Sequence, residues 1–161
     1  AAHLTQAERW LVMIAPPHIP YAPALLGHGV RLSRLMLIRP QAVEAQLWAG
    51  EQALRSGSCG AVMLWLSRVQ EQALRRLQLA AERSGALAML FRTARTPPFS
   101  SAALRLHVGK ADGRTIVRIL KRRGGGIPAP VVLDLHGAVA AQPVISRRPA
   151  VTIVRLPATA H

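Results

Sequence analysis

The stretch that decides the fold spans residues 42–91 and reads AVEAQLWAGEQALRSGSCGAVMLWLSRVQEQALRRLQLAAERSGALAMLF. In residues 42–55 the apolar side chains recur three and four positions apart, which places them on one face of a helix. Residues 61–66 then form an unbroken apolar run of strand length. A second helical period and a second apolar run at 86–91 repeat this order. Because strands alternate with helices, the stretch predicts an α/β fold with a mostly parallel sheet and flanking helices.

Both predicted helices have recognisable ends. Gly57 and Gly85 follow the two apolar periodicities, and glycine commonly takes the left-handed conformation that ends a helix. Ser67 is predicted to cap the start of the second helix, because a serine side chain accepts hydrogen bonds from the N–H groups of a first turn. The face of that helix directed at the sheet is expected to hold Val69, Ala73, Leu77 and Ala80.

The strand pattern extends to both sides of this stretch. Upstream, apolar runs at 10–15 and 35–38 predict two further buried strands, each closed by proline. Downstream, apolar and basic residues alternate on either side of the turn sequence Lys-Ala-Asp-Gly at 110–113, which predicts a C-terminal antiparallel hairpin. Residues 131–135 form another apolar run and predict one more strand.

The C-terminal stretch has a different composition. Residues 137–161 are rich in Ala, Pro and Arg and show no helical period, so we expect a flexible tail that docks on a partner. A short edge strand at 151–154 is the alternative. The predicted organisation is one domain at 1–136 followed by this tail.

Charge is the outlying property of the 161 residues. Lys and Arg number 21 and Asp and Glu 7, which gives a formal net charge of +14. Such a surplus favours nucleic acid, a membrane surface or an acidic protein as partner, although arginine excess alone is a weak indicator. The single cysteine, Cys59, excludes an internal disulfide, and no apolar run is long enough for a membrane helix. We therefore expect a cytoplasmic protein without a membrane partner.

Residues that could perform catalysis are scattered along the chain. No Gly-x-x-x-x-Gly-Lys-Ser/Thr phosphate loop occurs, and the glycine cluster at 124–126 lacks the strand-to-helix context of such a loop. His18 and His28 have no acid or cysteine nearby in the sequence to complete a metal site. Cys59 lacks an orienting base, which favours a small buried side chain. We expect no enzyme activity, no cofactor and no metal.

The hairpin and its exit contain most of the candidate binding residues. Between 105 and 123 seven cations stand against one acid, Asp112, which gives seven minus one, or +6. The cations are Arg105, Lys110, Arg114, Arg118, Lys121, Arg122 and Arg123. Because alternate side chains of a strand share a face, several are expected to form a strip that binds phosphates or an acidic partner. The alternative is a charged edge that prevents edge-to-edge pairing.

Several segments together resemble a known family. Residues 51–66 and 74–82, with 10–23 and 120–135, are similar to the ImuA family of SOS mutagenesis proteins and to its relative, the cell-division inhibitor SulA. The resemblance covers residues 8–136, and the segment at 120–135 goes beyond the shorter SulA pattern.

Both families are similar to the RecA core, so the resemblance implies a RecA-like domain at 1–136. In RecA an acid that serves the nucleotide's metal ends one strand, and a catalytic Glu follows an earlier strand. Here Leu66 and the stretch 15–18 stand at those places, and the phosphate loop would precede residue 1. The resemblance therefore implies a non-catalytic protein that does not hydrolyse ATP.

The resemblance also implies partners. An ImuA-like adaptor in translesion DNA synthesis would bind the polymerase-like protein ImuB, indirectly a DnaE-type polymerase, and RecA or DNA. The alternative is a SulA-like inhibitor that binds FtsZ, and a nucleic-acid binder that uses the fold only as a scaffold is a further one. The segment with 121–123 and Asp134 favours the adaptor. The loop around His18, Ile19 and Tyr21 is a second expected contact surface.

Overall fold

One mixed sheet organises the protein. The computed structural model describes residues 1–66, 68–93, 101–133 and, as backbone, 151–156. The strands are β1 (Trp10–Ile14), β2 (Leu35–Ile38), β3 (Cys59–Trp65), β4 (Leu87–Thr93), β5 (Leu104–Ala111), β6 (Arg114–Arg122), β7 (Val131–Leu133) and β8 (Val151–Leu156). The helices are α1 (Ala2–Gln6), α2 (Ala22–Gly27), the 3-10 turn η1 (Leu32–Arg34), α3 (Val43–Arg55) and α4 (Glu71–Ser84).

The strands lie in the order β2-β1-β3-β4-β8-β5-β6-β7. From β2 to β5 neighbouring strands are parallel, whereas β5, β6 and β7 pair antiparallel. This arrangement confirms the predicted α/β class, with a mostly parallel sheet, flanking helices and an antiparallel hairpin. The more specific RecA-like assignment stays a prediction.

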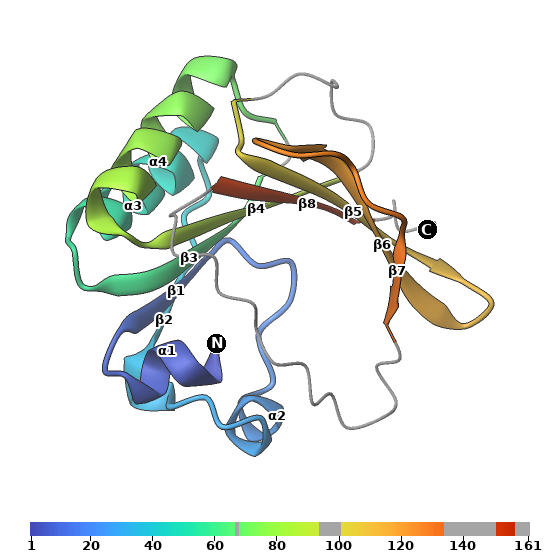
Figure 1. Cartoon of the computed structure of the whole chain (residues 1–161). Helices are drawn as coiled ribbons and strands as arrows, with labels where there is room; N and C mark the ends of the chain where they lie inside the picture. The colour runs from blue at the N-terminus through green and yellow to red at the C-terminus, as the bar shows by residue number, and fades with distance from the viewer. Residues whose placement is uncertain (67, 94–100, 134–150, 157–161) are drawn as a thin grey trace.

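Helices α3 and α4 cover one face of the sheet, which we call the helical face (Figure 1). Its core is built from fully buried aliphatic side chains of both helices and the sheet, such as Leu54 of α3, Leu77 of α4 and Leu64 of β3. Gly50 lets α3 approach closely, because a Cβ there would lie 2.5 Å from Leu64 Cδ2. Alanine, leucine and glycine therefore do the packing that larger aromatic residues do in many cores.

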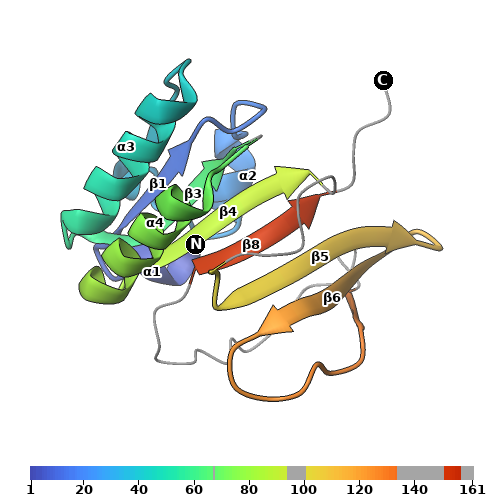
Figure 2. The same cartoon turned by 90° about the horizontal axis from the view of Figure 1, so that it is seen from above.

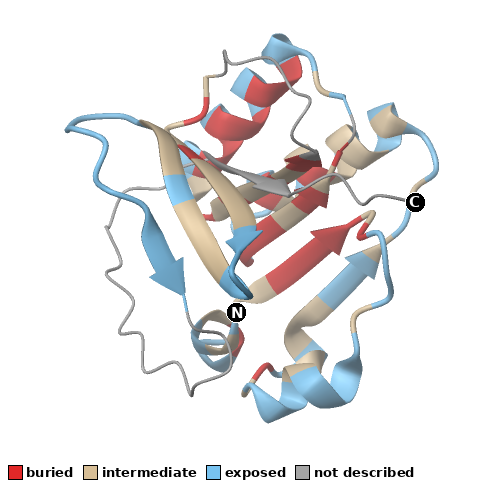
Figure 3. Ribbon diagram, turned by 90° about the vertical axis from the view of Figure 1, so that its right-hand side faces the viewer, coloured by how far each residue is buried: buried red, intermediate tan, exposed pale blue. Residues whose placement is uncertain are grey.

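The opposite face is packed by the short helix α1, and we call it the α1 face (Figure 1). Leu11, Met13 and Ala61 are buried there, with Leu4 of α1 packed against them. Farther along this face Trp65 and Phe91, aligned on neighbouring strands, stack with their ring centroids 4.5 Å apart. The buried residues of both faces concentrate in β1, β3, β4 and α4, as Figure 3 shows.

The ends of α4 and the hairpin turn test three local predictions. Gly85 follows α4 with φ 69°, the left-handed conformation expected of a glycine there. Asp112 and Gly113 connect β5 to β6 with φ of 50° and 73°, as a two-residue turn between twisted strands requires. The Ser67 cap is wrong: α4 begins at Glu71, and its N-cap is Gln70. Residues 68–70 are not helical, so α4 begins three residues later than a cap at Ser67 predicts.

The largest departure from the sequence prediction is β8. Residues 151–156, for which we expected a flexible tail or, as the alternative, an edge strand, lie between β4 and β5 and pair in parallel with both strands (Figure 2). A strand is therefore present, but inside the sheet and not at its edge. The Val-Thr-Ile-Val pattern suits an edge strand and an interior strand equally, and it does not indicate which neighbours the strand has. The rest of the predicted tail, including 137–150, lies outside the described residues, as does Asp134.

Candidate interaction surfaces

The basic strip lies on a hairpin whose register is interrupted. His107 is opposite Arg118, but the register shifts beside Arg105, so that Lys121 is opposite Arg105 and Arg122 is opposite Leu104. One extra residue on β6 therefore reverses the alternation of its side chains. Lys121 and Arg122, which follow Arg118, therefore each lie on the face opposite to the one that simple alternation predicts.

The register also shows which face each cation occupies. Arg105 and Leu90 are both aligned with residue 153 of β8, so they share the helical face. Lys121 and Arg118 belong to that face through their pairing with Arg105 and His107. Arg122, opposite Leu104, belongs to the α1 face. The structure thus divides the predicted strip between two faces.

Burial divides the strip further. Arg105 is only 7% exposed and Lys121 is half-buried, and both take part in interactions inside the protein. Arg123 forms an ion pair with Glu82 of α4 at 3.9 Å. The fully exposed members are Lys110, Arg114, Arg118, Arg122 and Arg123. On the helical face, Arg114 and Arg118 remain as the exposed cations of β6.

The loop predicted as a second contact surface presents large apolar groups to solvent. Ile19 is 71% exposed and Tyr21 is 72% exposed, and His18 beside them is also exposed. Leu26 of α2 is 56% exposed and extends this patch. The sequence analysis did not name Leu26, because the exposure of an apolar side chain depends on what packs against it. We call Ile19, Tyr21 and Leu26 the α2 patch.

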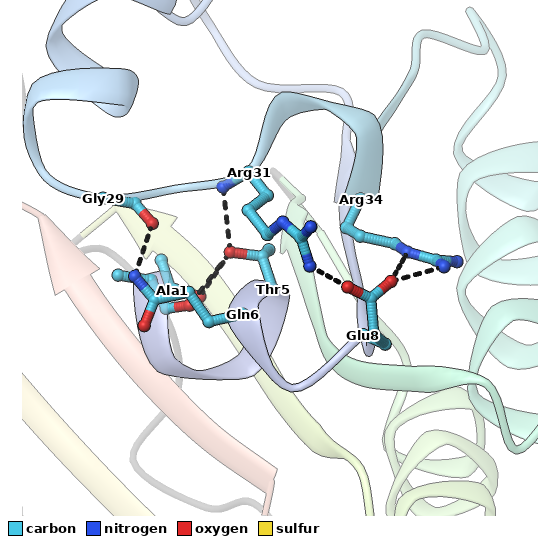
Figure 4. A network of polar contacts seen from close by, with 8 residues as sticks. Ala1, Thr5, Gln6, Glu8, Gly29, Arg31 and Arg34 are labelled. Carbon is cyan, nitrogen blue, oxygen red and sulfur yellow. Dashed lines mark hydrogen bonds and ion pairs between the residues drawn. The ribbon is translucent and has the colours of Figure 1, made fainter.

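A polar network fixes α2 and η1 against the N-terminal helix (Figure 4). Gln6 Nε2 donates a hydrogen bond to the carbonyl oxygen of Gly29 at 3.1 Å, and the backbone N–H of Arg31 donates to Thr5 Oγ1 at 3.1 Å. Glu8 receives ion pairs from Arg31 and, at 2.5 Å, from Arg34. These contacts tie the segment from Gly29 to Arg34, which follows α2, to the N-terminal helix and the residues after it.

The structure also places the described residues that the sequence analysis considered for catalysis or metal binding. Cys59 is buried as a free thiol, in agreement with the sequence expectation. Within the described ranges, no group of three or more His, Cys, Asp or Glu side chains is placed to hold a metal ion. Leu66, which stands at the place of the RecA metal-binding acid, is buried in the core. In the part of the chain that the structure describes, no helix is long and apolar enough to cross a membrane.

Comparison with known proteins gives one curated relative of clear similarity. The cell division inhibitor SulA of Edwardsiella piscicida is 31% identical to this chain over an aligned stretch of 108 residues, and the match covers 63% of this chain and 64% of that protein. The chain is similar to SulA. It spans less than two thirds of the length of this relative. No family model matches the chain.

Among solved structures, SulA from Pseudomonas aeruginosa is 30% identical to the chain, with a TM-score of 0.47. The match covers 53% of this chain and 71% of that one. The sequence similarity supports the relation to SulA that the family resemblance implied. The relation to ImuA and its partners stays a prediction.

Proposed function

We propose that this protein is a SulA-like inhibitor of cell division that acts by binding FtsZ and performs no catalysis. The observation that carries the proposal is the 31% identity with a cell division inhibitor over 108 residues. Binding rather than catalysis agrees with the buried Cys59 and with Leu66 at the place of a metal-binding acid. An inhibitor of assembly needs a surface that binds its target, and it needs no reactive group.

The α2 patch is the surface that we assign to this binding. Large apolar side chains at more than half exposure are unusual in a group, and interfaces place such residues at their centres. Ile19, Tyr21 and Leu26 satisfy that description, and the Glu8 network anchors the segment that follows α2. The aromatic ring of Tyr21 adds a hydroxyl that can form a hydrogen bond at the margin of a buried contact.

Purified FtsZ and cell filamentation test the proposal together. We expect the wild-type chain to reduce the amount of FtsZ polymer sedimented with GTP and to produce filamentous cells on expression. Ile19→Asp combined with Tyr21→Ala should weaken FtsZ binding about tenfold or more, because truncation of central apolar contacts costs the most. The matched control is Trp48→Ala with Leu79→Ala, which removes exposed apolar groups from α3 and α4. No effect of the wild-type chain on FtsZ would refute the proposed function, and equal losses in both variants would refute the α2 patch.

The second candidate is an ImuA-like adaptor on a RecA-like domain. Its specific support is the segment Leu120–Gly124 with Val132–Leu135, which resembles ImuA and of which β6 and β7 are the described parts. This hypothesis predicts tight binding to an ImuB-type protein, and with it indirect contact to a DnaE-type polymerase and contacts to RecA or DNA. A titration against ImuB at physiological salt, run beside the FtsZ titration, separates the two. Binding to ImuB without binding to FtsZ would replace the inhibitor by the adaptor.

A further inference from the structure

We propose that the β6–β7 end of the sheet binds an extended, acidic segment of a second protein. This surface is separate from the α2 patch, so the inference goes beyond the proposed function. It rests on three features of the same small area: an open groove with an apolar floor, an edge strand without charge, and two exposed arginines.

The groove lies beside the hairpin turn on the helical face. It has a volume of about 390 Å³ and is lined by Ala111, Asp112, Arg114, Ile116 and Val132. Ile116 and Val132 are directly paired across β6 and β7, and Val132 is 53% exposed. The two aliphatic side chains form a floor that one apolar side chain of a ligand would cover. A floor of this kind favours a peptide over a purely ionic ligand.

Strand β7 offers a backbone edge next to this groove. It is the outermost described strand on its side of the sheet, since the order ends with β6 and β7 (Figure 3). Its residues Val131, Val132 and Leu133 are all exposed, and none is charged. Natural sheets usually protect such an edge with lysine, a bulge, an inward charge or a very short strand. Of these β7 shows only the short length, with three residues, so an extended peptide can add beside it as another strand over a short stretch.

Charge indicates which peptide fits. Arg114 and Arg118 lie on the groove's face, and within the described residues no ion pair occupies either of them. Their spacing of four residues corresponds to roughly 13 Å along a strand. Carboxylates at alternate positions of an added strand lie on one face of the sheet and would meet both guanidinium groups.

The same features disfavour nucleic acid. A phosphate backbone needs a continuous row of cations, but Arg105 is buried, Lys121 is half-buried and Arg122 lies on the other face. Strands β6 and β7 contain no aromatic residue on which a base would stack.

Fluorescence anisotropy with labelled probes tests the inference. The probes are a short peptide of alternating aspartate and valine, the corresponding lysine–valine peptide, and oligo(dT). We expect the full chain to bind the acidic peptide, to ignore the basic one, and to lose affinity for the acidic peptide as salt rises. Arg114→Glu with Arg118→Glu should weaken acidic-peptide binding by about tenfold or more. The matched control is Arg75→Glu with Arg83→Glu on α4, which makes the same change of net charge at exposed positions.

A second variant separates the groove from charge alone. Val132→Ser keeps both arginines but removes one of the two aliphatic side chains of the groove floor. It should weaken binding of the acidic peptide several-fold, while the circular dichroism spectrum stays unchanged. Tighter binding of oligo(dT) than of the acidic peptide would overturn the inference in favour of nucleic acid. Absence of peptide binding, or equal losses in the β6 and α4 charge reversals, would overturn it as well. Binding of FtsZ, measured on the same samples, reports on the α2 patch independently.

Discussion

Apart from the edge strand β2, which is half-buried or exposed and not buried as predicted, the two ends of the sheet have opposite characters. Strands β1, β3 and β4 lie under α3 and α4, and side chains such as Leu64 and Leu90 are fully buried. Strands β6 and β7 extend beyond the helices, and their side chains are half-buried or exposed (Figure 3). The first end has the hydrophobic packing that stabilises a domain, whereas the second has exposed edges and charges that suit recognition. A single sheet can thus combine a rigid support with a binding surface.

The strongest test of this comparison removes the strand that joins the two ends. A chain that ends at residue 136 loses β8, which leaves β4 and β5 as unpaired edges in the middle of the sheet. We expect it to unfold or aggregate, because losing the pairing of β8 would remove much of the roughly 5–15 kcal/mol of free energy that stabilises ordinary domains. Circular dichroism and size-exclusion chromatography measure this. A chain that ends at Leu156 is the control, and normal folding of the shorter chain would show that 1–136 is an independent domain.

Matched leucine truncations compare the ends directly. Leu64→Ala should lower the free energy of unfolding by about 2–5 kcal/mol, since it opens a cavity between the sheet and α4. Leu106→Ala on half-buried β5 should cost only about 1 kcal/mol, because less apolar area leaves water there on folding. Urea denaturation gives both values. Similar losses at the two sites would contradict the contrast between the ends.

The hairpin turn provides a smaller test. Gly113 has φ 73°, a left-handed conformation in which a Cβ costs about 1–2 kcal/mol. Gly113→Ala should therefore destabilise the chain by that amount, although no atom crowds the position. Thermal unfolding measures the loss. Gly126→Ala, where the space is also open and the φ is not left-handed, should be close to neutral.

The smallest expected effect concerns the polar network that positions α2. Glu8→Gln weakens the ion pairs with Arg31 and Arg34, which are partly exposed, so the cost should stay at or below about 1 kcal/mol. The difference from wild type should shrink at high salt, because salt screens exposed pairs. Denaturation at two ionic strengths checks this. A loss that does not change with salt would show that Glu8 acts through packing.

Most of the individual elements were predictable from the sequence. The helix at 43–55 and the strand at 59–65 follow from apolar periods of three to four and from an unbroken apolar run, which depend only on local burial. The hairpin followed from alternation around Asp112 and Gly113, two residues that tolerate left-handed conformations. These signals are local, and so one sequence suffices to read them.

The missing parts depend on contacts between distant residues. The sequence of residues 151–156 does not indicate that the strand they form pairs with β4 and β5. The extra residue of β6 near Leu120 arises from pairing with β5, and it alone separates Arg122 from Arg118. The sequence therefore located these cations on one hairpin and its exit but did not show how they are shared between the two faces. Leu26 was missed for the same reason, since exposure of an apolar helix residue depends on what packs against it.

The central place of β8 has a consequence for how the protein is made. Translation produces β4 and the β5–β6 hairpin well before residues 151–156, yet the strand formed by 151–156 lies between them. The sheet can therefore be completed only after residues 151–156 have been made, and until then two strand edges that later become interior are available to other chains. We expect a nascent chain with this strand order to depend on chaperones or on fast insertion of β8.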